Sequence, residues 1–225
     1  MMPSLFTSFR SLCCLLLLSL SANVMAQENN GTDSERLLWT GVEFNYKLNK
    51  KWKLGVEQQF RFEDSFANYE KSVSEISVRR KLKKWWNLKL TYRFNGVPEG
   101  RNSGRIALDS KFEWDPKNNP VDFKYRLRIQ DETVYYTGQK ITFLRQEIEL
   151  DANLSKRVDP QLSYEHFYRF NGKNETRVHR FHLGLTWKLN KDAELKTFYR
   201  IDQEVNTRKL KTQHIFGASL AYDLN

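Results

Sequence analysis

The sequence predicts an all-β protein, a single antiparallel up-and-down transmembrane β-barrel of about 10 to 12 strands. Three observations support this fold class. Apolar residues recur at every second position from Leu38 onward, which is the spacing of a strand. Short turns alternate along the chain with longer polar loops, as they do in bacterial outer-membrane barrels. Five of the six tryptophans lie within three residues of a short turn, and indole rings concentrate at membrane interfaces.

Residues 1–26 have the features of a cleaved signal peptide. Arg10 precedes an apolar run at 12–20, and small residues then fit cleavage before Gln27. This run is too short to cross a bilayer as a helix, so we expect a signal and not an anchor. Both cysteines, Cys13 and Cys14, lie in this segment. The mature chain is therefore expected to have no disulfide, Cys-liganded zinc or Cys nucleophile.

The mature chain divides into a polar N-terminal segment at 27–36 and a barrel domain at 37–225, with no linker. In 180–189, apolar residues at the odd positions oppose polar or small residues at the even positions. The same alternation occurs in 52–63, 86–95 and 121–130. The expected strands are 37–48, 52–63, 72–82, 86–95, 104–114, 121–130, 141–154, 161–170, 178–189, 193–202 and 212–224.

The connections between these strands form two alternating classes. The short turns are 49–51, 83–85, 115–120, 155–160 and 190–192. The longer loops are 64–71, 96–103, 131–140, 171–177 and 203–211. Outer-membrane barrels place the short set on the periplasmic side and have an even number of strands, whereas these ranges give eleven. Three explanations remain open: a hidden twelfth strand in 27–36, a misassigned terminal strand, or a polar N-terminal segment that threads the lumen.

The polar faces of the strands are expected to line the lumen and the apolar faces to contact lipid. Basic residues slightly outnumber acidic ones on the polar faces, which indicates paired charges across a narrow interior. We therefore expect a plugged lumen or a thin, weakly anion-preferring pore. Strings of the type YRFN end the even-numbered strands and place four arginines inward, either as a ring at one mouth or paired with Asp and Glu. These lumen arginines are Arg93, Arg126, Arg169 and Arg200.

Aromatic residues are expected to form two interfacial girdles. The girdle beside the short turns consists of Trp52, Trp85, Trp86, Trp114 and Trp187. Aromatic residues also occur beside the longer loops, at about the distance that a tilted strand needs to cross a bilayer. A soluble barrel would also show alternating apolar and polar residues, but there is no physical reason for its tryptophans to gather along one rim.

The formal net charge of +10 raises the possibility of a nucleic-acid partner. The charges alternate singly with apolar residues and form no basic block, so no nucleic-acid partner is expected. Basic residues near the last longer loop are candidate contacts for lipopolysaccharide phosphates, or else solvated loop charges. These candidates are Arg208, Lys209 and Lys211.

No catalytic, cofactor or metal site is expected. His179 and His182 are three residues apart, which places them on opposite faces of a strand. An outer-membrane phospholipase needs a histidine two residues before its serine, and no histidine here has that spacing. His214 and Ser219 fall on opposite faces, so they cannot form an activated pair.

Several strings together resemble one known family. They are the opening LWTGVEFNYKLNKKWKL, the recurrent YRFN, YRI, YKLN and WKLN, and the closing HIFGASLAYDLN. They resemble the outer-membrane β-barrel family of domain of unknown function 2490 over about 38–225. The resemblance implies the outer membrane of a Gram-negative bacterium, with outer-membrane lipid and the barrel assembly machinery as partners and no established activity.

From the sequence we therefore expect an integral outer-membrane barrel without enzymatic activity, with a structural, binding or narrow-pore role. The alternatives are a soluble periplasmic ligand-binding β-barrel and, less favoured, a lipid-modifying outer-membrane enzyme.

Overall fold

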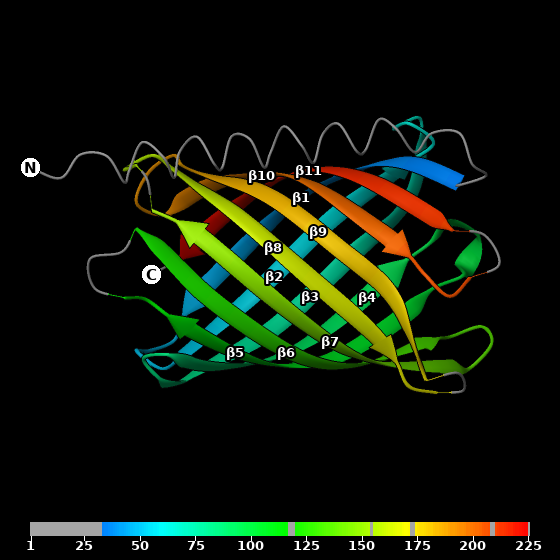
Figure 1. Ribbon diagram of the computed structural model, residues 1–225, viewed down its shortest axis with the longest axis horizontal. Helices are drawn as coiled ribbons and strands as arrows, with labels where there is room; N and C mark the ends of the chain where they lie inside the picture. Colours follow the sequence, from blue (N-terminus) through cyan, green and yellow to red (C-terminus); the bar gives the residue numbers. More distant parts are fainter. Residues whose placement is uncertain (1–32, 117–119, 154, 172–173, 208–209, 225) are drawn as a thin grey trace, which may run out of the picture. The chain divides into compact units, whose positions relative to one another are not determined.

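The alternating residues form β-strands that close into a barrel (Figure 1). The computed structural model describes residues 33–116, 120–153, 155–171, 174–207 and 210–224. Within these residues there are eleven strands: β1 (Asp33–Lys47), β2 (Trp52–Glu63), β3 (Asn68–Lys83), β4 (Trp86–Gly96), β5 (Ser103–Trp114), β6 (Val121–Val134), β7 (Gln139–Ala152), β8 (Val158–Arg169), β9 (Glu175–Lys188), β10 (Ala193–Glu204) and β11 (Lys211–Leu224). The described residues contain no helix long and apolar enough to cross a membrane.

Each strand pairs with its neighbours in the sequence, and β1 pairs with β11 to close the barrel. The up-and-down β-barrel is thereby confirmed. One part of the expectation is wrong, because the closing pair is parallel and not antiparallel. Successive strands reverse direction, so an odd number of strands makes the first and the last run the same way. The expected even number is not found in the described residues.

The parallel closure places the two ends of the barrel chain at opposite rims. We call the N-terminal rim the end where β1 begins and where the β2–β3, β4–β5, β6–β7, β8–β9 and β10–β11 connections lie. The C-terminal rim is the end where β11 stops and where the other five connections lie, at the left of Figure 1. The expected signal peptide at 1–26 and residues 27–32 lie outside the described residues. Strand β1 begins at Asp33, inside the segment 27–36 that was expected to be polar and outside the barrel.

The expected difference between short turns and longer loops is wrong. The β2–β3 connection contains only 64–67 and the β6–β7 connection only 135–138, which makes both as short as 48–51 between β1 and β2. The strands continue beyond the last alternating apolar residue at the N-terminal rim. For example, Thr133 of β6 still pairs with Lys140 of β7. Backbone hydrogen bonds hold such a ladder together without apolar side chains, so hydrophobic alternation underestimates the strand length.

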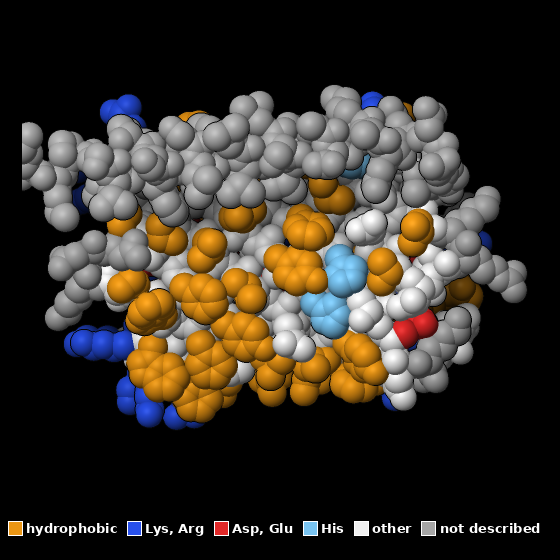
Figure 2. Space-filling model, viewed as in Figure 1, with side chains coloured by type: hydrophobic (Ala, Val, Ile, Leu, Met, Phe, Trp, Pro, Cys, Tyr) orange, Lys and Arg blue, Asp and Glu red, His pale blue; other side chains and the backbone are white. Residues whose placement is uncertain are grey.

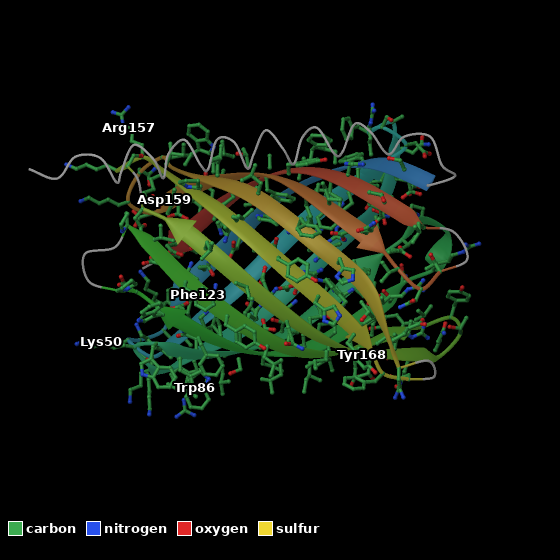
Figure 3. The ribbon with its side chains drawn as sticks, viewed as in Figure 1. Lys50, Trp86, Phe123, Arg157, Asp159 and Tyr168 are labelled. Carbon is green, nitrogen blue, oxygen red and sulfur yellow. The ribbon has the colours of Figure 1, made fainter. Side chains whose placement is uncertain are left out.

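The alternation sends charged side chains into the barrel and large apolar side chains outward (Figures 2 and 3). In β6, the inward residues Arg128 and Gln130 are 7% and 2% exposed, whereas Ile129 between them is 53% exposed. Arg36, Arg80 and Asp131, which point away from the lumen, each lie three residues from the end of their strand. The middle of the barrel wall is therefore apolar outside and polar inside, the reverse of a water-soluble barrel.

Candidate functional site

The centre of the barrel interior is a buried cluster of ion pairs around Glu165 of β8. Its carboxylate oxygens accept hydrogen bonds from Arg145 Nη2 at 2.7 Å and Arg126 Nη2 at 2.8 Å. Arg180 Nη1 lies 3.4 Å from the same carboxylate and also pairs with Asp202. The Glu165 side chain is only 2% exposed. Because an unpaired buried charge is costly, these guanidinium and carboxylate groups hold strands β6 to β10 in one arrangement.

Aromatic rings and arginines fill the interior beside this cluster. The guanidinium of Arg61 stacks on Trp39 with its Cζ 3.6 Å from the ring centroid. Phe198 meets Trp39 edge to face and stacks on His182, at centroid distances of 6.5 Å and 5.2 Å. Arg200 lies over both Trp39 and Phe198. This stacking gives the guanidinium groups of Arg61 and Arg200 aromatic partners inside the barrel.

Phe198 is accommodated by Gly217 on the neighbouring strand β11. A Cβ atom at Gly217 would lie 2.0 Å from Cζ of the Phe198 ring, so any side chain there forces the ring to move. We expect Gly217→Ala to lower the free energy of unfolding by about 1–3 kcal/mol, as overpacked cores do. Denaturant unfolding of the refolded protein measures this. The double variant Gly217→Ala, Phe198→Leu should recover part of the loss, and a loss unchanged in the double variant would contradict the steric cause.

The four expected lumen arginines do not form one ring. Arg93 lies three residues before the end of β4 and pairs with Glu75 at 2.7 Å. Arg126 lies eight residues before the end of β6 and pairs with carboxylates of β7 and β8. Arg169 ends β8 at the N-terminal rim, whereas Arg200 belongs to the aromatic stack. The level of each arginine differs because β6 extends well beyond its YRLR string, and pairing with acidic side chains is the arrangement found for two of them.

Towards the C-terminal rim, the interior contains a cavity of about 300 Å³. Its walls include Asn87 and Glu113, which lie near that rim. A second cavity of about 150 Å³ is lined by Lys191 and Asp192 of the β9–β10 connection and shares the side chain of Arg79 with the first. We call these two cavities the vestibule.

Cations outnumber carboxylates around the larger cavity of the vestibule. Its basic lining residues are Arg79, Lys89, Lys111, Arg126, Arg128 and Arg200. Its acidic lining residues are Asp109, Glu113, Glu147 and Glu149. Most form pairs, such as Lys111 with Glu149 at 3.2 Å. Among the described residues, Arg79 has no hydrogen bond or ion pair, and Arg200 hydrogen-bonds only to Nδ1 of His182. The vestibule can therefore attract small anions.

Arg79 and His182 were not singled out from the sequence as site residues. Alternation places both side chains inward, but it does not show which inward cation lacks a carboxylate neighbour. That depends on the cross-strand register, for example on the pairing of Arg79 with Lys53 and Lys89 in adjacent strands. Three basic residues side by side leave Arg79 without an acidic partner.

The five tryptophans expected beside the short turns all lie at the C-terminal rim. Trp52 and Trp86 begin β2 and β4, Trp85 precedes β4, Trp114 ends β5, and Trp187 is one residue from the end of β9. Of the expected lipopolysaccharide contacts, Arg208 and Lys209 lie outside the described residues. Lys211 begins β11 at the N-terminal rim, where its Nζ lies 2.7 Å from Glu35 Oε1.

The histidines occupy the faces that alternation assigns to them. His182 lies in the lumen, whereas His179 and His214 on the outer face hydrogen-bond to the hydroxyl groups of Tyr164 and Tyr199, both at 2.7 Å. His166 pairs with the hydroxyl of Thr176 at 3.0 Å. In the part of the chain that is described, no group of three His, Cys, Asp or Glu residues could hold a metal ion.

Comparison with known families gives one match. The family model described as protein of unknown function (DUF2490) matches residues 37–213. This match covers nearly all of the barrel. No curated protein matches the chain.

Proposed function

The chain belongs to the DUF2490 family of proteins of unknown function, and from this premise and the distribution of its side chains we propose that it is a non-enzymatic integral β-barrel protein of the outer membrane of a Gram-negative bacterium. The signal peptide expected at 1–26 would direct it across the inner membrane.

One observation carries this proposal: the outer wall is apolar and exposed while the interior is charged and buried. Ile76, Ile106 and Leu162 on the outer wall are 60%, 58% and 52% exposed. Figure 2 shows the apolar side chains as one broad area on the face in view. An apolar surface of this kind is unfavourable in water and favourable in hydrocarbon. Aromatic side chains such as Trp114 at one rim and Tyr136 at the other add the two girdles of a transmembrane barrel.

Cell fractionation combined with heat modifiability on a gel tests the location. We expect the protein in the outer-membrane fraction, with a faster-migrating folded form that disappears on boiling. Recovery in the soluble periplasmic fraction, without a mobility shift, would favour the soluble ligand-binding barrel instead.

The vestibule supports a second candidate role, the binding or slow passage of small anions. Of the cations that line the larger cavity, Arg79 and Arg200 have no carboxylate partner among the described residues. Beyond it, towards the N-terminal rim, the inward side chains of Ile215, Glu165 and Val73 have almost no exposed surface. Such tight packing narrows the interior and favours a binding role over an open pore.

We expect any pore to be narrow and weakly anion-preferring. Planar-bilayer recordings should give a conductance far below that of a 16-stranded porin, because buried side chains fill the interior. Arg79→Gln should reduce the preference for anions, since it removes an unpaired cation from the entrance. A porin-sized conductance, or an anion preference that Arg79→Gln leaves unchanged, would contradict this picture.

A further inference from the structure

The β1–β2 and β3–β4 connections, together with the end of β3, bring six cations together at the C-terminal rim. Strands β2 and β3 pair so that Trp52 lies opposite Arg80. The backbone N–H of Lys81 donates a hydrogen bond to the carbonyl of Lys51 at 2.7 Å, which fixes the two connections side by side. All six side chains are exposed. We call this group the cationic corner; it consists of Lys50, Lys51, Arg80, Lys81, Lys83 and Lys84.

No acidic side chain balances the cationic corner. Residues 44–56 and 76–90 contain no Asp or Glu. Among the described residues, none of the six cations forms an ion pair. Of the carboxylates at this rim, Asp223 pairs with Lys53 at 2.8 Å and Glu113 lines the larger cavity. Asp115, which follows β5 at the same rim, forms no ion pair with the six cations among the described residues. The expectation that the charges form no basic block is therefore wrong here, because strand pairing adds the β1–β2 connection to the run 79–84.

A row of stacked aromatic rings lies directly beside the cationic corner on the outer wall. Trp85 stacks on Trp86, Trp86 on Phe112, and Phe112 on Tyr125, with ring centroids 6.0–6.5 Å apart. Lys83 Nζ lies 5.2 Å from the centroid of the Trp85 ring, so the cationic corner contacts the aromatic row directly. Similarly, Arg80 Cζ lies 5.1 Å from the Trp52 ring. Figure 3 labels Lys50 and Trp86 at this same end of the barrel, where Figure 2 shows blue side chains beside the apolar area.

We propose that the cationic corner and its aromatic row bind the headgroups of anionic phospholipids. This inference rests on the membrane location proposed above. Lys81 shares the inward register of Arg79 at the mouth of the lumen. From the other cations of the corner, the outer surface changes along the barrel axis to aromatic rings and then to aliphatic side chains. A lipid leaflet presents the complementary order of phosphate, interface and hydrocarbon. A nucleic acid would match the cations, but it would leave the adjoining apolar wall uncovered.

The anionic lipid that fits this rim is a phospholipid and not lipopolysaccharide. At the C-terminal rim the tryptophans stand at the strand ends, so the apolar wall reaches almost to the connections. At the other rim, strands such as β6 and β7 run on through polar residues, including Asp131 and Lys140. Outer-membrane barrels extend further on the extracellular side. The cationic corner therefore faces the periplasmic leaflet, which is made of phospholipid.

Tryptophan fluorescence tests this proposal, because five of the six tryptophans lie at the C-terminal rim. The full chain is reconstituted in vesicles of phosphatidylcholine that contain increasing fractions of brominated phosphatidylglycerol or brominated phosphatidylcholine, since bromine quenches indole fluorescence on contact. A cation beside an anionic surface strengthens binding about fivefold. We therefore expect brominated phosphatidylglycerol to quench with an apparent affinity at least about fivefold above that of brominated phosphatidylcholine, with the difference reduced at high salt.

The variant that removes the charge is Lys50→Gln, Lys51→Gln, Lys83→Gln, Lys84→Gln, which leaves every ring in place. Its matched control removes four cations from the N-terminal rim: Arg36→Gln, Arg101→Gln, Lys140→Gln, Arg177→Gln. The first variant should quench equally with both brominated lipids, while the control should keep the preference of the unmodified chain. Heat modifiability confirms that both variants are folded.

The outcomes separate this inference from the proposed membrane location. Equal quenching of the unmodified chain by both lipids, or a preference that the first variant retains, overturns the phospholipid site and leaves the membrane location standing. Loss of the preference in the control as well shows a general charge effect and overturns the site. When unbrominated lipids are added as competitors, relief of the quenching by lipopolysaccharide but not by phosphatidylglycerol overturns the choice of lipid. Quenching by neither lipid contradicts the membrane location itself.

Discussion

Glu165→Gln is expected to lower the free energy of unfolding by about 3–5 kcal/mol, the usual cost of removing one partner from a buried ion cluster. The carboxylate of Glu165 lies within hydrogen-bond or ion-pair distance of Arg145, Arg126 and Arg180. An amide has similar size and retains one acceptor oxygen, but it carries no charge. The substitution therefore leaves three guanidinium groups close together in the buried interior without their shared anion.

Urea unfolding of the refolded barrel in lipid vesicles measures this effect, and Glu204→Gln is its matched control. Glu204 also pairs with an arginine, Arg177, but at 3.4 Å and at the N-terminal rim with 27% and 30% of the side chains exposed. Exposed ion pairs contribute at most about 1 kcal/mol. Equal losses in the two variants would mean that the interior is wet, and the tightly packed interior described above would be wrong.

The strands and their faces could be predicted from the sequence because each depends on local alternation. The expected strand at 178–189 corresponds to β9, Glu175–Lys188, with His182 inward and Leu183 outward as expected. A period of two assigns every side chain to a face once one residue is fixed. The starting and ending residues could not be predicted at the N-terminal rim, where polar residues on both faces end the signal while the ladder continues.

The partners of each side chain could not be predicted, because they depend on register between distant residues. Glu165 meets Arg126 from a strand 39 residues earlier in the chain. Lys51 and Lys81 become neighbours through the pairing of β2 with β3, although the two residues are far apart in the sequence. The parallel closure has a similar origin, because it follows from the number of strands that the whole chain supplies. Alternation within one segment carries no information about that number.

Leu183→Arg should lower the free energy of unfolding in lipid by about 2–4 kcal/mol, because the middle of the apolar wall would face hydrocarbon. Leu183 lies in the middle of β9 and points outward with 42% of its surface exposed. An arginine there would place its charge in hydrocarbon. Leu127→Arg, at an outward position of β6, should have a similar effect.

The matched control is Leu189→Arg at the C-terminal rim, where the same side chain reaches the headgroups and should cost about 0–1 kcal/mol. On the inner face, Thr186→Ser should be nearly silent. Unfolding of all four variants in the same vesicles measures the depth dependence. Equal costs at Leu183 and Leu189 would show that the wall does not contact hydrocarbon, and the proposed membrane location would be abandoned.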